Sequence, residues 1–457
     1  MEYLSLVLFV AVCLVLLTGY PVAFALAGTS LVFAFIGSFI GVFDTAFMHA
    51  LPSRIFGIMN NQTLLAVPLF VFMGVVLEKS KIAEELLISI SQLFSRFRGG
   101  LAIAVVMVGA LLAASTGIVG ATVVTMGLLS LPAMLKQKYN PSIACGSICA
   151  VGTLGQIIPP SIALVLLGDV ISNAFQQSQL DMGIFSPETV SVGDLFVGAI
   201  VPGVLLVVLY LVYLLAVAWF KPEYLPAFDS KEKVKLGQLI KAVVPPILLI
   251  IIVLGSILAG FATPTEAAAI GAFGALVLAL AKGALNIKML TSANKATLTC
   301  TCMVFLILIG ASVFSLVFRG LGGEELIESV FENLPGGVFT AMLLVMVILF
   351  LLGFILDFIE ITFVVVPIVA PVLLSMGLDP VWLGIMIAIN LQTSFLTPPF
   401  GFALFYLRGV ADKAIKTTQI YKGVVPFIII QLFVLVALAL WPELATWLPS
   451  VVYADGF

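Results

Sequence analysis

Charged side chains are scarce in this sequence. Only 9% of its 457 residues are Asp, Glu, Lys or Arg, whereas about 25% is usual in soluble globular domains. Hydrophobic residues make up 62% of the chain, and its mean hydropathy is +1.27. About a dozen apolar stretches are long enough to span a bilayer as helices, and short polar connections separate them. The composition therefore excludes a soluble globular protein and predicts a polytopic α-helical membrane protein.

Residues that bind metals or form disulfides are also rare. The single histidine, His49, lies near Arg54 in an expected outer connection, and we assign it no chemistry. The five cysteines lie in apolar runs without a nearby histidine, so we interpret them as small buried hydrophobes: Cys13, Cys145, Cys149, Cys300 and Cys302. No basic stripe indicates nucleic acid. The first apolar run lacks a basic flank and a small-residue cleavage site, so we expect a first membrane helix instead of a signal peptide.

The distribution of charge predicts a topology, because basic connections stay in the cytoplasm. Eighteen of the 20 Lys and Arg residues form five clusters: Lys79, Lys81, Arg96 and Arg98; Lys136 and Lys138; Lys221, Lys231, Lys233, Lys235 and Lys241; Lys282, Lys288 and Lys295; Arg408, Lys413, Lys416 and Lys422. The acidic connections 169–194 and 319–332, and the C-terminal Glu443 and Asp455, are assigned to the outer side. Segment 99–135 must then enter and leave on the cytoplasmic side, and segment 336–378 on the outer side.

Both segments are therefore hairpins, and two interpretations of each remain open. The arms are long enough to form an ordinary pair of spans, but they also fit a hairpin that turns back inside the membrane. The first tip, 115–120, has no charge, and the second, 357–360, has acids without bases. These tips favour re-entrant hairpins, whose irregular backbone must be buried in protein or line an aqueous cavity.

An internal repeat relates the two hairpins. A shift of 239 residues superimposes 122–160 on 361–399 without a gap, and six of 39 positions are identical. Four of the six are prolines, which mark backbone geometry: Pro132, Pro141, Pro159 and Pro160 coincide with Pro371, Pro380, Pro398 and Pro399. Since the charge pattern places the two hairpins on opposite sides, the repeat is predicted to be inverted, as in many secondary transporters.

Each hairpin is followed by a helix that we expect to begin at Pro141 or Pro380 and to break within 152–161 or 390–401. A proline has no amide hydrogen, so each pair leaves two carbonyls without helical partners: those of Gly155 and Gln156, and those of Ser394 and Phe395. Free carbonyls in a low-dielectric environment suit a dehydrated cation. The alternative is a proline kink satisfied by neighbouring hydroxyls. Polar side chains concentrate at the breaks: Thr153, Gln156, Ser161, Asn390, Gln392, Thr393, Ser394 and Thr397.

Two acids, Asp357 and Glu360, fall at the second hairpin tip. A charge near mid-bilayer costs at least about 2.5 kcal/mol unless it is paired or hydrated, which indicates a role. Three roles are open: a cation ligand, a proton relay, or a structural pair with an amide. A fourth interpretation is that these acids lie in the exposed turn of an ordinary spanning hairpin.

With the repeat and both breaks in view, nearly the whole chain resembles the large, DctM-like membrane subunit of tripartite ATP-independent periplasmic (TRAP) transporters. The segments that show this resemblance are 54–56, 65–74, 115–122, 152–161 and 397–401. The resemblance implies an all-α elevator-type ion-transporter fold, with an inverted repeat, two re-entrant hairpins and two broken helices, driven by sodium. The long connection 169–194 is similar to the branch assigned to mannitol, chloroaromatic or keto-acid compounds.

The resemblance also implies partners. These are a small four-helix DctQ-like membrane subunit and a soluble periplasmic binding protein that delivers organic acids. Because Met1 begins directly at the first helix of the large subunit, we expect a separate chain to supply the small subunit. The chain would lie in the bacterial inner membrane, in contact with lipid, with its C-terminus in the periplasm.

Family sodium sites involve hairpin tips and broken helices, and the resemblance implies that two or more Na+ ions bind here. The corresponding residues are Ser115, Thr116, Gly117, Gly152, Thr153 and Gly155 in the first copy, and Asp357, Thr362, Asn390, Thr393 and Thr397 in the second. The substrate region would include Gln156, Ser161, Gln392, Ser394 and the proline pairs Pro159, Pro160, Pro398 and Pro399. Helix N-termini near Ser161 and Phe400 would face the anion, and no membrane arginine is evident as a carboxylate clamp.

The predicted organisation has five segments: scaffold helices and an interfacial arm in 1–98, transport repeat 1 in 99–176, scaffold helices in 177–335, transport repeat 2 in 336–411, and a C-terminal helix in 412–457. Within the first segment, the amphipathic stretch 82–98 is expected at the cytoplasmic interface or as a plain surface helix. A rival function is a stand-alone sodium-coupled dicarboxylate or citrate carrier. An intramembrane hydrolase is a remote alternative. Aspartyl proteolysis needs two facing carboxylates, and the sequence shows no second mid-span acid on another helix that could face Asp357. We therefore expect no enzyme activity.

Overall fold

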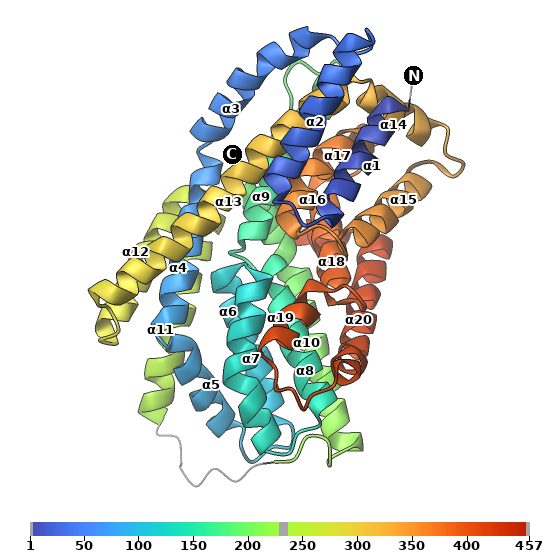
Figure 1. Cartoon of the computed structure of the whole chain (residues 1–457). Coiled ribbons are helices and arrows are strands. Elements are labelled where there is room, and N and C mark those ends of the chain that lie inside the picture. The colour runs from blue at the N-terminus through green and yellow to red at the C-terminus, as the bar shows by residue number, and fades with distance from the viewer. Residues whose placement is uncertain (1–2, 228–235, 454–457) are drawn as a thin grey trace. The chain divides into compact units, whose positions relative to one another are not determined.

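The computed structural model describes residues 3–227 and 236–453, and in this part of the chain all regular structure is helical (Figure 1). The basic residues Lys231, Lys233 and Lys235 and the acidic Asp455, used in the charge pattern, lie outside the described residues.

Helices long and apolar enough to cross a membrane dominate the described residues. There are seven of them: α2 (Val22–Phe39), α7 (Val119–Lys136), α10 (Val192–Phe220), α11 (Leu236–Leu258), α12 (Pro264–Ala281), α13 (Ile287–Gly320) and α20 (Thr417–Leu440). Shorter apolar helices accompany them: α1 (Leu4–Leu17), α6 (Gly100–Thr116), α15 (Gly337–Leu352) and α18 (Pro380–Leu396). The predicted class, an all-α polytopic membrane protein, is confirmed.

The chain divides into two compact units. Unit 1 consists of Met1–Leu65, Leu166–Ser191 and Thr299–Leu383, and unit 2 consists of Ala66–Val165, Val192–Leu298 and Gly384–Phe457. Three of the five boundaries between the units fall inside helices: α9 (Ile162–Asp181), α13 and α18. The predicted scaffold and transport segments are defined by which parts of the chain move together during transport. The two units are defined only by contacts between residues, so they do not test that prediction. The five predicted segments therefore stay a prediction.

In unit 2 the first hairpin packs on one helix. Its arms α6 and α7 lie side by side, and both contact α8 (Pro141–Thr153) (Figure 1). The packing is close because glycines of α8 face side chains of the hairpin: a methyl group on Gly152 would lie 2.1 Å from Cγ2 of Val123. On another side α8 packs against α20, where Gly146 meets the backbone of Gly423. Small residues let helix backbones approach closely in membrane proteins.

A buried tyrosine holds the base of this hairpin. The Leu101 amide at the start of α6 donates a hydrogen bond of 3.2 Å to the Tyr139 hydroxyl, which lies just beyond α7. Burial raises the pKa of Tyr139 to about 12. The hydroxyl therefore remains neutral at physiological pH and satisfies an amide that the helix start leaves without an intrahelical partner.

The other elements of unit 2 are α4 (Ala66–Lys79), α5 (Ile82–Leu93), η3 (Leu154–Gln156), α19 (Phe402–Val410) and α21 (Glu443–Val452). Of the predicted amphipathic stretch 82–98, residues Ile82–Leu93 form the helix α5. One face of α5, including Ile82, Leu86 and Ile90, is buried against α6 and α11, and Glu85 on the helix pairs with Lys282. Its position at a membrane interface stays a prediction.

Unit 1 contains the second hairpin, formed by α15, α16 (Phe358–Val364) and α17 (Val366–Ser375). Its second arm is bent by 56° between α16 and α17, whereas the corresponding arm α7 of the first hairpin is a single helix. The difference follows from one residue. Pro367 stands at the start of α17, where the first copy has Leu128, and a proline ring clashes with the helical turn before it.

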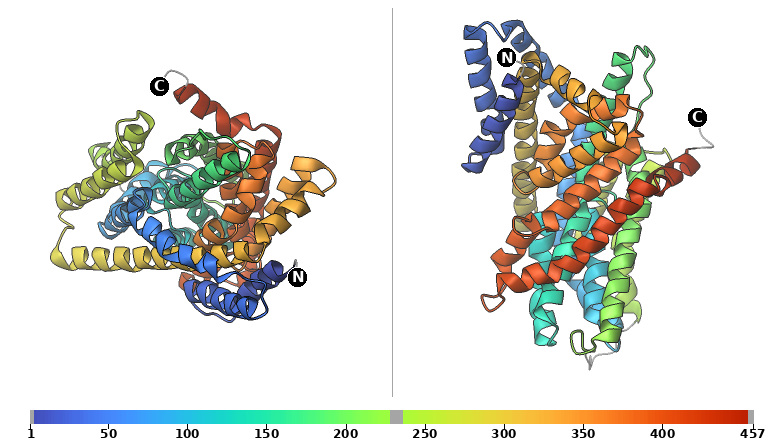
Figure 2. Two further views of the ribbon diagram at one scale, coloured as in Figure 1. Left: turned by 90° about the horizontal axis from the view of Figure 1, so that it is seen from above. Right: turned by 90° about the vertical axis from the view of Figure 1, so that its right-hand side faces the viewer.

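The remaining elements of unit 1 are η1 (Thr45–Ala50), α3 (Leu51–Asn60), η2 (Thr63–Leu65) and α14 (Gly323–Glu332), beside α1, α2 and parts of α9 and α13. The α1–α2 pair lies beside α13 in both views of Figure 2. Here too a glycine allows close packing, because a methyl group on Gly310 would lie 2.6 Å from the Ala23 carbonyl oxygen.

The two copies of the repeat have matching element orders. In the first, α6, α7 and α8 precede a break and α9; in the second, α15, α16–α17 and α18 precede a break and α19. Both helices before the breaks begin at the predicted proline: the Asn140 side chain accepts from the Ser142 amide, and the Asp379 side chain accepts from the Trp382 amide. The Pro159–Pro160 and Pro398–Pro399 bonds are both cis. The predicted hairpins, helix starts and breaks are therefore present.

Candidate ion and substrate sites at the helix breaks

The first break is fully enclosed within unit 2. Helix α8 ends at Thr153, the short η3 follows, and the chain passes through the proline pair to Ser161. Gly152, Thr153, Gly155, Gln156 and Ser161 are all buried. The side-chain oxygen of Gln156 is buried and has no hydrogen-bond partner among the described residues. This is the feature expected of a polar interior that receives an ion or water.

The tip of the first hairpin rests directly on this break. A methyl group on Gly155 would lie 3.3 Å from the Ala113 carbonyl oxygen and 3.6 Å from Cα of Gly117. Gly117 has a φ of +60°, and a methyl group on it would lie 2.8 Å from the Ile162 amide nitrogen. Ser115 and Thr116 form the last turn of α6, just before this contact. Of the first predicted sodium set, Gly117 and Gly155 are therefore brought together, backbone against backbone.

One expectation about the first break is wrong in detail. The carbonyl of Gly155 is not free, because the Ser161 hydroxyl donates a hydrogen bond of 2.6 Å to it. The first residue after the proline pair thus replaces one of the two missing amide donors. A carbonyl oxygen has two lone pairs, so this bond occupies one acceptor position and fixes the direction of the other.

The second break is shorter than predicted. Residues 390–396 belong to the regular helix α18, and only residues 397–401 separate it from α19. The physical reason is that a proline removes only its own amide, so the helix continues to the residues just before the pair. The Ser394 carbonyl accepts from the Thr397 amide at 3.0 Å and is not free.

Threonine hydroxyls of the second break are used locally. Thr393 donates to the Ile389 carbonyl at 2.8 Å, and Thr397 donates to the Thr393 carbonyl at 2.7 Å. Asn390, Gln392, Thr393 and Ser394 are buried in unit 2, whereas Thr397 and Pro398 are half-buried and Pro399 is exposed. The second break is thus more open than the first.

The acids of the second tip form a helix cap. The Asp357 carboxylate accepts from the Phe358 amide at 2.7 Å, and the Glu360 carboxylate accepts from the Asp357 amide at 2.9 Å. This reciprocal arrangement is a capping box at the start of α16. Of the three open roles, the structure shows the structural pair. A sodium-binding role for Asp357 stays a prediction.

The second predicted sodium set is divided between the units. Asp357 and Thr362 belong to unit 1, whereas Asn390, Thr393 and Thr397 belong to unit 2. The Thr362 hydroxyl is buried without a hydrogen-bond partner among the described residues, which leaves it available within unit 1.

Sequence reasoning missed a buried polar residue beside the first break. Gln431 of α20 donates to the Tyr210 hydroxyl at 2.8 Å and to the Thr153 hydroxyl at 3.3 Å. Gln392 also faces Tyr210, without a hydrogen bond of standard geometry. The signal was present in the sequence, because Gln431 is an isolated amide in the apolar run 424–440. It fixes Thr153, a member of the predicted sodium set.

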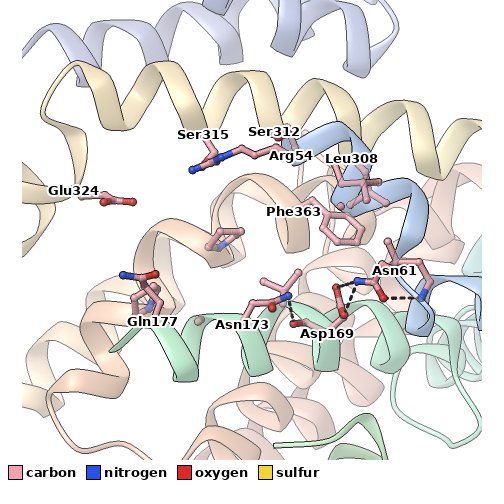
Figure 3. Close-up of a pocket in the computed structure, with 18 residues that line it drawn as sticks. Arg54, Asn61, Asp169, Asn173, Gln177, Leu308, Ser312, Ser315, Glu324 and Phe363 are labelled. Atoms are coloured by element: carbon pink, nitrogen blue, oxygen red, sulfur yellow. Dashed lines mark hydrogen bonds between the residues drawn. The ribbon is translucent and has the colours of Figure 1, made fainter. Parts of the chain in front are cut away.

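A cavity of about 590 Å³, lined by both apolar and polar side chains, lies within unit 1 (Figure 3). Its polar side chains come from α3, from the connection between α3 and η2, and from α9, α13 and α14. They are Arg54, Asn61, Asp169, Asn173, Gln177, Ser312, Ser315 and Glu324. The sequence placed Arg54 near His49 in an expected outer connection and showed no arginine evident as a carboxylate clamp. Arg54 belongs to the helix α3, and it lines this cavity.

The apolar spans, helical hairpins and proline-broken helices together define the class: a multi-pass α-helical transporter fold. The YdaH transporter of Alcanivorax borkumensis is similar in structure, with a TM-score of 0.60 and 14% identity over 88% of each chain. MtrF of Neisseria gonorrhoeae also has a TM-score of 0.60, at 13% identity over 86% of this chain and 83% of that one. At these identities the likeness concerns the fold alone.

The sequence defines the family. Residues 9–444 match the family described as "Tripartite ATP-independent periplasmic transporter, DctM component". The chain is 29% identical to the C4-dicarboxylate TRAP transporter large permease protein DctM of Vibrio cholerae, over 97% of each chain. It is 28% identical to the sialic acid TRAP transporter large permease protein SiaM of Vibrio cholerae, over 96% of this chain and 97% of that one. It is 27% identical to the ectoine/5-hydroxyectoine TRAP transporter large permease protein UehC of Ruegeria pomeroyi, over 98% of this chain and 99% of that one.

The chain belongs to this family of large TRAP permease subunits. It is a multi-pass membrane transporter subunit and not an enzyme, as the predicted resemblance implied. Large permeases of this family work with a small membrane subunit and a periplasmic binding protein.

Proposed function

We propose that this chain imports a small organic acid across the bacterial inner membrane, driven by sodium, by an elevator motion of the hairpin-containing segments. A separate small four-helix subunit and a periplasmic binding protein complete the transporter, and the binding protein delivers the acid. The C-terminal helix α21 faces the periplasm, where the positive-inside rule places a terminus that has acids and no bases.

The observation that supports this proposal most strongly is the contact between the first hairpin tip and the first break. Gly117 and Gly155 bring two irregular backbone segments together in a buried region. Irregular backbone in a membrane protein is stable only when it is buried in protein or lines a cavity, and such segments form ion sites in secondary transporters. The unpartnered side-chain oxygen of Gln156 adds an acceptor there.

The energetics fit import against a gradient. Each sodium ion that enters down a membrane potential of about 100 mV supplies about 2.3 kcal/mol. We propose two or more ions, bound at the two tips before the substrate. The organic anion then binds near Ser161 and Phe400 of unit 2, where helix N-termini favour negative charge.

Replacing sodium by potassium outside proteoliposomes is expected to reduce uptake to background. The liposomes contain this chain, its small subunit and the loaded binding protein, under a fixed membrane potential. The physical reason is that oxygen sites of fixed size and number distinguish the two ions. Equal uptake in the two salts would contradict sodium coupling. Uptake by this chain without the other two proteins would instead favour the stand-alone dicarboxylate or citrate carrier.

Two substitutions of Asp357 separate its cap from a role at a sodium site. Asparagine is as good an N-cap as aspartate but has no charge, whereas alanine removes both. If Asp357 binds sodium, Asp357→Asn is expected to raise the sodium concentration for half-maximal uptake at least about fivefold, because the ion loses a charged ligand. Ser375→Ala, which removes a side chain at the far end of the same hairpin, is the control. If only Asp357→Ala reduces uptake, the residue acts as a helix cap alone.

A further inference from the structure

The cavity in unit 1 has a separated pair of opposite charges. Arg54 enters it from α3, and Asp169 enters it from α9 (Figure 3). Arg54 is half-buried, and among residues 3–227 and 236–453 it has no carboxylate oxygen within 4.0 Å. A guanidinium offers five donors in a planar fork that matches a carboxylate. The cavity therefore has one available anion-binding group.

The acids of the cavity are held in different ways. Glu324 pairs with Arg319, with Nε of the arginine 2.8 Å from the carboxylate. Arg319 is therefore the direct ion-pair partner of Glu324, and the more distant Arg54 adds a weaker favourable charge. Burial raises the pKa of Glu324, and the Arg319 guanidinium opposes this shift.

Asp169 is oriented by a rigid amide. Asn61 donates to both Asp169 carboxylate oxygens, at 3.0 Å and 3.2 Å. The Asn61 carbonyl in turn accepts from the amides of Thr63 and Leu64, which fixes the direction of its amide group. A carboxylate has about four acceptor positions, so the two contacts with Asn61 leave Asp169, which lines the cavity, with further acceptor capacity.

A second acidic region adjoins the cavity. Gln177 and Glu324 also line a neighbouring hollow of about 300 Å³, whose other side chains include Asp181, Glu325 and Glu328. Gln177 donates to the Asp181 carboxylate at 2.8 Å. The surroundings of the cavity are thus acidic except at Arg54 and Arg319, so a ligand with two carboxylates would place one of them against like charge.

We propose that this cavity binds a small monocarboxylate that has hydrogen-bond donors elsewhere, such as a hydroxy acid, with its carboxylate on Arg54 and a hydroxyl on Asp169. The volume of about 590 Å³ suits a small organic molecule. The inference rests on the proposed function, because it names the substrate class of the transporter, and it predicts poor binding of C4 dicarboxylates. The cavity belongs to unit 1, whereas Ser161 and Phe400 belong to unit 2, so it would be an additional site for the same acid.

The test measures thermal stabilisation of the purified full chain in detergent, in constant sodium, by glycolate, glycerate, gluconate, succinate and mannitol. At least one hydroxy acid is expected to raise the melting temperature, and neutral mannitol is expected to have no effect. Succinate is expected to bind at least about tenfold more weakly than the best hydroxy acid. Stabilisation by succinate alone, or by none of the three hydroxy acids, would overturn the proposal.

Three variants locate the effect. Arg54→Gln is expected to weaken hydroxy-acid binding at least about tenfold, because a charge-assisted bidentate contact is lost. Asp169→Asn keeps a polar group beside Asn61 but removes the negative charge, so it is expected to improve succinate binding. Arg98→Gln, which removes an exposed arginine of unit 2, is the matched control and should change nothing.

The outcomes are distinct from those of the sodium experiment. If Arg54→Gln binds the acids as the unchanged protein does, or if Asp169→Asn does not alter the preference for succinate, the cavity is not the substrate site. Sodium-driven uptake in the reconstituted system would still stand in that case. Conversely, hydroxy-acid binding that depends on Arg54 can be observed even if uptake is equal in potassium and sodium. That pair of results would contradict only the sodium coupling.

Discussion

Replacing Gly117 by alanine is expected to lower sodium-driven uptake at least about tenfold while leaving the protein in the membrane. Gly117 has a φ of +60°, and the added methyl group would lie 2.8 Å from the Ile162 amide nitrogen. A left-handed conformation costs a residue with a side chain roughly 1–2 kcal/mol. The contact with backbone atoms adds to this cost, because no side-chain rotation can relieve it. We therefore expect the hairpin tip to separate from the helix break and the ion site to lose its geometry.

A second glycine provides a matched control for the backbone strain. Gly183 has a φ of +82°, but a methyl group on it would meet nothing within 4 Å. Gly183→Ala therefore has a similar conformational cost without a collision. Uptake rates and sodium dependence of both variants should be measured in proteoliposomes at equal protein content. If the two variants lose the same activity, strain at a turn explains the loss, and the tip-to-break contact has no special role.

Gly146→Ala is expected to have the largest effect on stability. The new methyl group would lie 2.0 Å from the carbonyl oxygen of Gly423 and 2.4 Å from its carbonyl carbon. Overpacking of a well-packed interior typically costs 1–3 kcal/mol and occasionally more. Because backbone faces backbone here, we expect about 3 kcal/mol or more, since α8 and α20 must move apart. Gly423→Ala is expected to behave alike, because its methyl group would lie 1.9 Å from the Ser142 carbonyl oxygen.

The measurement is the melting temperature of the detergent-solubilised protein, followed by the monodisperse fraction in size-exclusion chromatography. Gly409→Ala is the control, because Gly409 lies in the helix α19 and a methyl group on it would meet nothing within 4 Å. Alanine favours helix over glycine, so this variant should be as stable as the unchanged protein or slightly more stable. Equal melting temperatures for the Gly146 and Gly409 variants would contradict the packing described for α8 and α20.

Much of the architecture follows from local rules. Apolar runs of sufficient length must be helices in a membrane, because every backbone polar group needs an internal partner. Prolines at matched positions identified the starts of α8 and α18 and the two breaks after them. Proline is informative because its ring and its missing amide act on the chain at once, whatever the tertiary surroundings are.

The limits of the sequence appear at the second break and at the second tip. The side chains from Asn390 to Ser394 were assigned to the break because they are polar, but they lie on the helix α18. Polarity identifies a side chain that needs partners, not the backbone conformation that provides them. Likewise, the sequence left the role of Asp357 open, since a capping box and an ion ligand require the same residue type.

The sequence alone determined the class, the family, the two hairpins and the proline breaks, because these depend on composition, spacing and the chemistry of single residues. Only the tertiary structure showed that Ser161 meets the Gly155 carbonyl, that Gln431 meets Thr153, and that Arg54 and Asp169 line one cavity. These groups lie far apart in the chain or face one another only after a turn. Their meeting depends on how helices pack, and close packing is decided by the shapes of many side chains together.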